Sequence, residues 1–273
     1  MKIFGAVAIA LLAGCATTAP QTKALLASPP TVARHVDIPD VPFIEQSSGH
    51  CGPAALAMAM GWAGHAVSAE ELAARVMTPA MNGSLQEDLV SASRREGMMA
   101  VKITGMNALL AELDAGHPVI IFENLGLSWY QQWHYALVRG YDLPKEELIM
   151  HSGPNASERT DMRIFERSWK LSDYWALVIL KPGETAFTGT ELANLQAAAG
   201  LEQANKTEAA QVSYVAILKR WPESLGALVG LGNIAYTEKN FKQAVAYLRK
   251  AAKLYPDSPI VAHNLKVAES SAH

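Results

Sequence analysis

The central part of the chain combines hydrophobic patterns of two kinds, one typical of short helices and one typical of strands. Apolar residues at helical spacing predict helices over 51–62 and 107–114, with two more beginning near 68 and 84. Short apolar runs between turn residues predict strands over 99–103, 118–122, 133–141, 148–151 and 174–180. Most of the helices come first and a mostly antiparallel sheet follows, so the pattern predicts an α+β domain over 41–182.

Two short sequences mark expected helix starts within this domain. Ser68-Ala69-Glu70-Glu71 and Ser84-Leu85-Gln86-Glu87 both match the S-x-x-E capping box, in which the serine and the glutamate each satisfy a backbone N–H at the helix start. We therefore expect one helix to begin at each serine, the second of them ending at Gly97.

Beyond residue 182 the strand patterns disappear, and residues 189–273 predict an all-helical domain. Ala210 and Ala244 are 34 residues apart, as are Pro222 and Pro256. With Leu231-Gly232, this spacing resembles the tetratricopeptide repeat, with one good repeat over 225–258, a weaker one over 191–224 and a capping helix near 259–270. A plain helical hairpin packed on the first domain is the alternative. Such repeats bind partner peptides on a concave surface.

The N-terminus has the pattern of a targeting signal. Met1-Lys2 precedes an apolar run of twelve residues, which is too short for a membrane-spanning helix and suits a signal peptide over 1–14. Leu12-Ala13-Gly14-Cys15 resembles the bacterial lipoprotein signal, which implies that Cys15 is lipidated. An ordinary signal peptide that contains a cysteine is the alternative. Residues 15–40, rich in Ala, Thr and Pro, are expected to form a tether.

A lipoprotein signal would place the protein in the bacterial cell envelope. Ala16 follows the cysteine where similar lipoproteins of the inner membrane carry Asp, so we expect an outer-membrane anchor with the body facing the periplasm. If Cys15 is lipidated, Cys51 is the only free thiol.

Composition and charge argue against several classes of partner and cofactor. Half of the residues are apolar (50%) and 18% are charged, which is typical of a globular protein. The formal net charge of −3 argues against a nucleic-acid partner. Two cysteines cannot form a disulfide framework or a four-cysteine zinc site, and no C-x-x-C or H-E-x-x-H motif is present, so we expect no metal and no cofactor.

The segment from Gln46 to Leu56 contains the strongest candidate chemistry. Cys51 stands at the start of an apolar helix, where unpaired N–H groups and the helix dipole favour the nucleophilic thiolate. Gln46, five residues earlier, carries an amide that could donate to an oxyanion beside the sulfur. His134 begins a later strand and could meet the cysteine across a cleft, the two held as a thiolate–imidazolium pair.

These motifs carry a family resemblance. Cys51-Gly52-Pro53-Ala54-Ala55-Leu56 with a preceding glutamine, followed by His134-Tyr135-Ala136-Leu137-Val138 and Gly140-Tyr141-Asp142, resembles the double-glycine, bacteriocin-processing peptidases, over about 41–180. The resemblance implies a papain-like fold and peptide-bond hydrolysis through a thioester. It implies that Gln46 is an oxyanion donor, Cys51 the nucleophile and His134 the general base and acid.

The chain departs from the family pattern at two positions. Gln46 is one residue closer to Cys51 than in the transporter-borne members. Where the family carries an aspartate that orients the imidazole, this chain has His151, with Asn155 as a second candidate. A neutral His151 would stabilise an imidazolium less well than a carboxylate, so a slow enzyme, or one that relies mainly on a Cys–His dyad, is expected.

Three functions fit these observations. The first is a membrane-anchored cysteine peptidase that cleaves an envelope protein or peptide and binds a partner through its repeats. The second is a lipoprotein scaffold or adaptor that uses a degenerate peptidase fold only for binding. The third keeps the chemistry but acts as a cell-wall amidase or acyltransferase.

Overall fold

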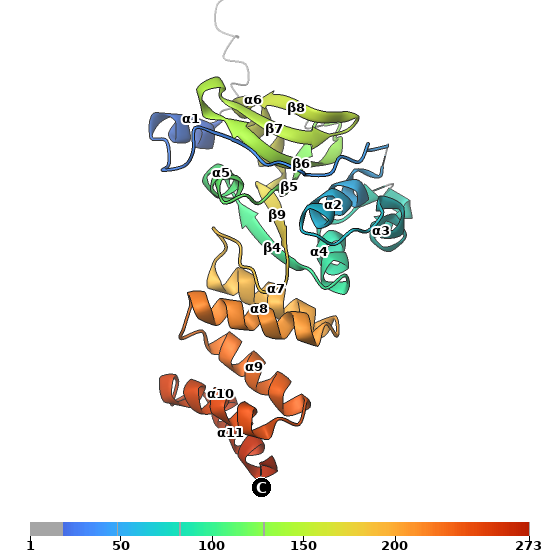
Figure 1. Ribbon diagram of the computed structural model, residues 1–273. Helices are drawn as coiled ribbons and strands as arrows, with labels where there is room; N and C mark the ends of the chain where they lie inside the picture. The colour runs from blue at the N-terminus through green and yellow to red at the C-terminus, as the bar shows by residue number, and fades with distance from the viewer. Residues whose placement is uncertain (1–18, 48, 82, 128, 273) are drawn as a thin grey trace, which may run out of the picture.

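The computed structural model describes residues 19–47, 49–81, 83–127 and 129–272. A sheet flanked by helices forms the first part of the molecule, and five C-terminal helices extend away from one end of it (Figure 1). The predicted α+β architecture is confirmed. The predicted signal peptide and Cys15 lie outside the described residues.

One antiparallel sheet organises the first part. Its strands pair in the order β4-β9-β5-β6-β7-β8, and β1 pairs with the part of β6 beyond its pairing with β5. Each predicted strand is present, with its ends within two residues of the expected positions. The strands of this sheet are β1 (His35–Asp37), β4 (Met99–Thr104), β5 (Val119–Asn124), β6 (Trp133–Asp142), β7 (Glu147–Ser152), β8 (Asn155–Asp161) and β9 (Trp175–Leu180).

Helices cover the sheet on both sides (Figure 1). One side carries α2 (Cys51–Trp62), α3 (Ala69–Val76) and α4 (Gln86–Arg95); the other carries α1 (Pro20–Ala27), α5 (Met106–Asp114) and α6 (Met162–Trp169). Three short 3-10 helices connect elements: η1 (Pro79–Met81), η2 (Leu143–Lys145) and η3 (Lys170–Ser172). Helix α2 is buried over most of its length, because its alanines and methionines face neighbours on every side. None of the described helices combines the length and the hydrophobicity that crossing a bilayer requires.

The two expected capping boxes have different outcomes. Ser68 caps α3, and its hydroxyl and the Glu71 carboxylate satisfy each other's backbone N–H groups as predicted. The box at Ser84 is wrong, because α4 begins at Gln86 after Leu85. Ser84 instead ends β3 (Gly83–Ser84), which pairs with β2 (Met77–Thr78), and its carbonyl accepts a hydrogen bond from the Tyr135 hydroxyl.

Much of the expected tether is folded onto the sheet domain. Helix α1 lies against α6, where the buried Glu166 carboxylate accepts hydrogen bonds from the backbone N–H groups of Gln21 and Thr22 at 2.9 and 2.7 Å. Leu25 is buried in the main core. These contacts join segments more than 140 residues apart, so no local pattern in residues 15–40 announces them.

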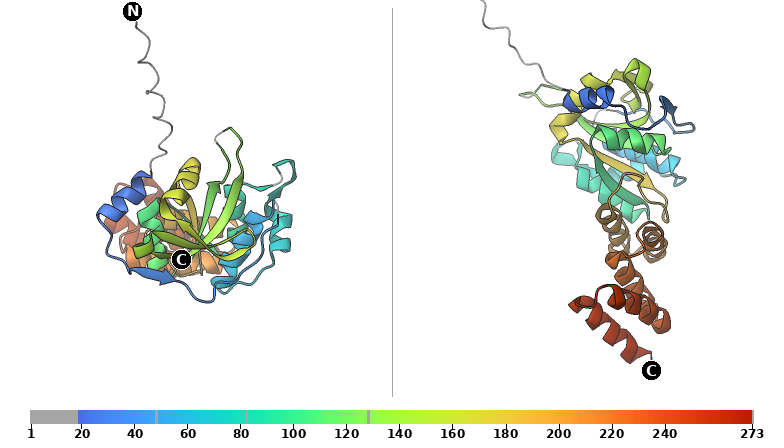
Figure 2. Two further views of the ribbon diagram at one scale, coloured as in Figure 1. Left: turned by 90° about the horizontal axis from the view of Figure 1, so that it is seen from above. Right: turned by 90° about the vertical axis from the view of Figure 1, so that its left-hand side faces the viewer.

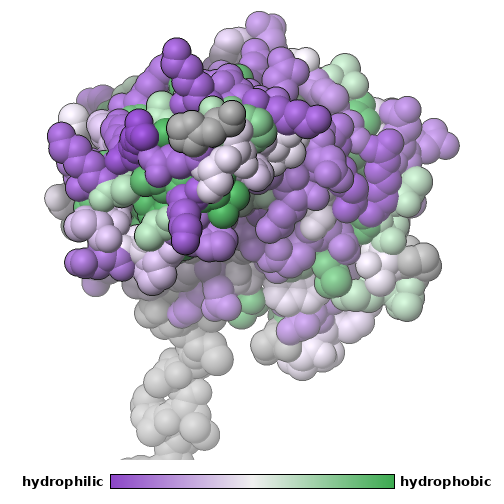
Figure 3. Space-filling model, turned by 90° about the horizontal axis from the view of Figure 1, so that it is seen from below, coloured by the Kyte–Doolittle hydropathy of each residue, from purple (hydrophilic) through white to green (hydrophobic). Residues whose placement is uncertain are grey.

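The C-terminal helices are α7 (Glu191–Gln203), α8 (Thr207–Arg220), α9 (Leu225–Thr237), α10 (Phe241–Leu254) and α11 (Pro259–Ser271). They stack away from the sheet, and the C-terminus lies at the end opposite α1 (Figure 2). In the pair formed by α9 and α10, Gly232 allows close approach, since a Cβ there would lie 2.7 Å from the Leu248 side chain. Seen from below, this end of the molecule is mostly hydrophilic (Figure 3).

The connection between the two parts is held by side chains from both. The buried Glu112 carboxylate on α5 accepts hydrogen bonds from the backbone of Phe187 and Thr188 in the linker. Arg220, at the end of α8, donates to the carbonyls of Ala186 and Phe187. Helix α7 also packs against β4 and α4, so the linker and the first repeat helices form one packed unit with the sheet domain.

Candidate active site

Cys51 is the first residue of α2 and is half-buried. His50 precedes it in a non-helical conformation, and Pro53 lies in the first turn, where the helix does not need its missing N–H. Gly52 packs closely against Ser84 and the Tyr135 ring, because a Cβ at this position would lie within 3.1 Å of the first and 3.3 Å of the second. The helix start therefore rests directly on β3 and β6.

Gln46 lies beside Cys51 and links it to the sheet. Its amide nitrogen donates to the Tyr135 carbonyl at 3.2 Å and approaches the Cys51 carbonyl at 3.5 Å. Its amide oxygen accepts a hydrogen bond of 2.8 Å from the Gly153 N–H, and the Gln46 N–H donates to the Gly153 carbonyl at 3.1 Å. The end of β7 thus fixes the amide so that its N–H groups point toward the start of α2.

His134 stands near the start of β6, one residue before Tyr135. Its Nε2 lies 3.1 Å from the Ser152 hydroxyl on β7. The Tyr135 ring lies under α2, and successive side chains in a strand alternate, so the His134 ring and Ser152 lie on the other face. The Cys51 thiol is in contact with the backbone of Tyr135, the residue joined to His134. Among the described residues no hydrogen bond joins the thiol to the imidazole.

The structure places the two candidate orienting residues away from His134. The His151 Nε2 bonds the Val41 carbonyl at 3.2 Å, and its ring packs edge-on against Phe43. Because neighbouring residues of β7 face opposite sides, His151 and Ser152 cannot both face His134. Asn155 bonds Glu158 at an exposed position. The hydrogen-bond partner of His134 on β7 is therefore Ser152 and not His151, and strand alternation is the signal that could have identified it.

Burial shifts both ionisable groups toward their neutral forms. It raises the pKa of the Cys51 thiol, and hydrogen bonds from the backbone of Tyr135, Gly52 and Cys51 itself oppose this rise without cancelling it. It also lowers the pKa of the His134 imidazole, against the opposite effect of the Glu158 carboxylate. The expected thiolate–imidazolium pair is therefore not favoured at rest, because the desolvation of each charge outweighs the groups that stabilise it.

A buried carboxyl group accompanies His134 on the sheet. Glu123 on β5 is its direct cross-strand partner, and its side chain bonds the Ser168 hydroxyl on α6. Burial, with a smaller contribution from Glu158, raises the pKa of Glu123 to about 7. Glu123 stands within an apolar run, so no sequence pattern marks it as a site residue.

A cavity of about 380 Å³ opens beside Cys51. Its walls come from the start of α2, from the segment that includes β3, and from the ends of β5 and β6. The lining residues are Gly49, Cys51, Met81, Gly83, Ser84, Leu85, Gln86, Phe122, Gln131, Trp133 and Tyr135. The thiol is therefore reachable from a cleft.

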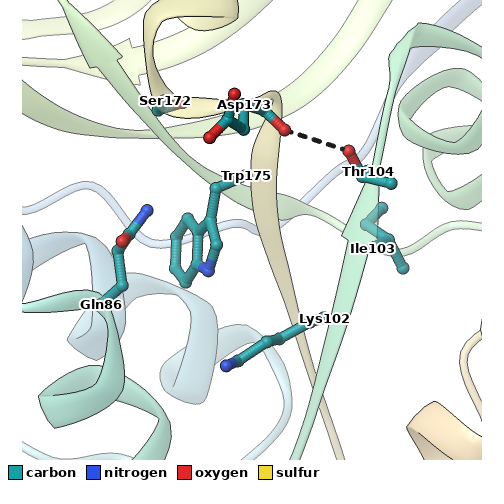
Figure 4. A pocket seen from close by; sticks show the side chains of 7 residues that line it. All are labelled: Gln86, Lys102, Ile103, Thr104, Ser172, Asp173 and Trp175. Carbon is teal, nitrogen blue, oxygen red and sulfur yellow. Dashed lines mark hydrogen bonds between the residues drawn. The ribbon is translucent and has the colours of Figure 1, made fainter.

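A second cavity of about 390 Å³ shares Gln86 with the first (Figure 4). Unlike the first cavity it has charged residues in its lining, Lys102 and Asp173, and a hydrogen bond joins Thr104 to the Asp173 carbonyl. Cys51 does not line this cavity. No group of three or more potential metal-ligating side chains is clustered anywhere in the described part of the chain.

Comparisons with known proteins identify both parts of the chain. The model of the Peptidase_C39 like family matches residues 38–176, and a tetratricopeptide repeat model matches residues 226–258. The predicted repeat is thereby confirmed. No curated protein matches the chain.

The solved structures that resemble the first part include the following three. A protein from Bacillus anthracis described as a C39-like peptidase is 20% identical, with a TM-score of 0.45, over 55% of this chain and 98% of its own. The peptidase domain of Streptococcus ComA, a bifunctional ABC transporter of a quorum-sensing pathway, is 22% identical, with a TM-score of 0.43, over 51% and 98%. A double glycine motif protease from an AMS/PCAT transporter, in complex with the leader peptide, is 21% identical, with a TM-score of 0.41, over 54% and 95%.

The family match spans half of the chain and contains all of the residues gathered around the cavity beside Cys51. The chain therefore belongs to the Peptidase_C39 like family.

Proposed function

We propose that this protein is a cysteine peptidase that hydrolyses peptide bonds of a protein or peptide substrate through a thioester on Cys51. One observation carries the proposal: the Gln46 amide and the Cys51 thiol both contact the backbone of Tyr135, directly after His134, at the mouth of a cleft. The nucleophile and the oxyanion donor are thus held together, beside the backbone of the residue that follows the base.

The neutral resting state defines the first chemical step. His134 acts as a general base at Nδ1, the nitrogen that does not contact Ser152, and takes the thiol proton as the sulfur attacks the scissile carbonyl carbon. Substrate binding brings the thiol and the imidazole into hydrogen-bond distance, as in other enzymes whose catalytic contacts tighten in the complex. Ser152 holds the ring, in place of the carboxylate of a full triad.

The remaining steps follow from the same groups. The developing oxyanion lies near the backbone N–H groups at the start of α2 and near the Gln46 amide, whose 3.5 Å contact with the Cys51 carbonyl is weak enough to be exchanged. The imidazolium returns its proton to the leaving amine, which departs and leaves a thioester. Water, deprotonated by the same imidazole, then releases the acid and regenerates the thiol.

Peptide cleavage is the direct test. The full-length protein in detergent is incubated with a peptide mixture derived from an envelope proteome, and new termini are identified by mass spectrometry. We expect termini with the wild type and none with Cys51→Ala. His134→Ala should lower the rate about 10²- to 10⁴-fold, whereas His263→Ala, at an exposed position, should not. Cleavage by Cys51→Ala, or an inactive wild type, would contradict the proposal.

The helical repeats are proposed to bind a protein partner or the substrate itself. The tetratricopeptide match over 226–258 supports this role, since stacked helix pairs present extended binding surfaces. Removing residues 221–273 is not a safe test, because Ala227, Leu231 and Ile234 of α9 belong to the main core and α8 packs against this helix. Charge substitutions on exposed residues of α9 and α10, assayed by cross-linking in the envelope, would test it without removing a packed element.

We also propose that a lipid on Cys15 anchors the protein to the outer membrane, with the body in the periplasm. The support is the sequence of residues 1–15 alone. Two acyl chains or more would hold the protein firmly, because each buried methylene contributes about 0.8 kcal/mol. Cys15→Ser should move the protein from the membrane pellet to the soluble fraction, and continued pelleting after a salt wash would refute the anchor.

A further inference from the structure

The cavity beside Cys51 has an unusual lining for a site that is open to solvent. Its described lining residues include no Asp, Glu, Lys, Arg or His. Besides the thiol, the polar side chains are those of two glutamines and one serine, the Trp133 N–H and the Tyr135 hydroxyl, and that hydroxyl already donates to the Ser84 carbonyl at 3.1 Å. A charged substrate group would therefore leave water without gaining an opposite charge.

Three aromatic rings from two neighbouring strands form one wall. Phe122 on β5 stacks on Trp133 with ring centroids 4.8 Å apart and also contacts Tyr135 at 4.4 Å. The Trp133 ring is 40% exposed, and its N–H bonds the Gln131 side chain at 3.2 Å. The wall is thus assembled before any substrate binds, and its apolar faces remain available.

Exposed apolar side chains continue from this wall along the connection between β5 and β6. Leu125, Leu127, Trp129 and Tyr130 are between 56% and 81% exposed. The Asn124 side chain joins the two ends of this connection, since it accepts hydrogen bonds from the Gly126 and Gln132 N–H groups at 2.9 and 2.8 Å. On the opposite wall, Met81 and Leu85 are 61% and 47% exposed. Apolar residues gathered in this way usually mark a binding surface.

We propose that this cavity is a specificity pocket for a large, uncharged apolar side chain of an extended substrate, adjacent to the bond that Cys51 cleaves. The pocket lies between the start of β6, which carries Trp133, and the segment that carries Leu85. This inference rests on the proposed function and adds the chemical class of residue that the site selects. Burying such a side chain should raise kcat/KM about tenfold to a hundredfold over alanine at the same position.

The first experiment compares substrates. Fluorogenic peptides that differ at one position near the scissile bond, carrying Phe, Leu, Ala, Asp or Lys there, are assayed with the full-length protein. We expect kcat/KM to be highest for Phe and Leu and lowest for Asp and Lys. Cleavage that requires Cys51 but shows no preference at any position flanking the bond would overturn the pocket and leave the peptidase proposal intact.

The second experiment changes the pocket. Leu85 is exposed and precedes α4 at a position where aspartate is a favourable helix cap, so Leu85→Asp adds a charge at little cost to folding. We expect kcat/KM for the Phe peptide to fall at least tenfold and that for the Lys peptide to rise. Leu192→Asp, at the exposed start of α7, is the matched control and should change neither. Equal effects of the two variants would refute the assignment.

A binding measurement separates the two proposals if no cleavage is found. The same peptides, bound to Cys51→Ala and followed by fluorescence anisotropy, should bind more tightly with Phe than with Asp by at least tenfold. That preference without wild-type cleavage would refute the peptidase while supporting the pocket. Equal binding of the Phe and Asp peptides would overturn the pocket.

Discussion

The buried carboxyl group beside His134 should make the stability of this protein depend on pH in a characteristic way. Glu123 is only 4% exposed and faces Ser168 and the His134 strand, with the Glu158 carboxylate as an unfavourable neighbour. Its pKa is raised to about 7, so in the folded protein it holds its proton far more tightly than in the unfolded chain.

The sign and size of the effect follow from this difference. Because the folded pKa lies above the unfolded one, the stabilisation is full below the ordinary value of 4.5 and is lost as pH rises to about 7. The difference corresponds to about 3 kcal/mol at 1.36 kcal/mol per pH unit. Glu123→Gln keeps the shape and removes the titration, so this pH-dependent loss should disappear from the variant.

Urea unfolding followed by tryptophan fluorescence at intervals from pH 4.5 to pH 8 measures this directly. The unfolding free energy of Glu123→Gln minus that of the wild type should increase over this range by about 3 kcal/mol. Glu238→Gln, at an exposed position, is the control and should give a nearly constant difference. Parallel curves for Glu123→Gln and the wild type would show that this carboxyl group titrates normally and would refute the reasoning.

Further outcomes are expected at the site and in the sheet. Ser152→Ala should lower kcat/KM about tenfold, because the imidazole loses one orienting hydrogen bond. His151→Ala should leave the pH profile of kcat/KM unchanged, since His151 bonds the Val41 carbonyl instead. A larger loss of activity in His151→Ala than in Ser152→Ala would contradict the orienting role of Ser152. Alkylation of Cys51 by iodoacetamide, located by mass spectrometry, should be slower at pH 7 than that of free cysteine, because its pKa is raised; half-maximal labelling below pH 7 would instead indicate an ion pair. Gly140→Ala should lower the melting temperature, because its Cβ would lie 2.2 Å from a backbone oxygen of β1, while Gly83→Ala, which has space, should not.

The strands of the sheet could be predicted from the sequence because each carries its own pattern of apolar residues. The 133–141 run and the 99–103 run appear in the structure as β6 and β4 with nearly the expected ends. Strand β8 was missed, because it is an edge strand of largely polar, exposed residues and has no apolar pattern. Helix α1 was missed because Glu166, far away in the sequence, supplies its capping contacts.

The sequence predicted part of the local geometry of the site, while the catalytic roles of Cys51, Gln46 and His134 stay predictions. Cys51 begins α2 as expected, and Gln46 lies beside it. Choosing between His151 and Ser152 requires knowing which face of β7 lies beside His134, a difference of one residue that depends on strand register. The pKa of the Cys51 thiol depends on burial by the whole fold. The helix dipole alone therefore suggests a lower pKa than the folded protein gives this thiol.

The hydrogen bonds from Glu112 and Arg220 to the linker have a consequence for how a bound polypeptide would be handled. A freely hinged pair of domains would only raise the local concentration of whatever the second domain holds. Here the hydrogen bonds hold the linker against both parts, so a polypeptide that the repeats bind, as proposed, would be cut where its chain reaches Cys51. The number of residues between the repeat-bound segment and the cleaved bond would then help to select the cleavage position, in addition to the residue beside that bond.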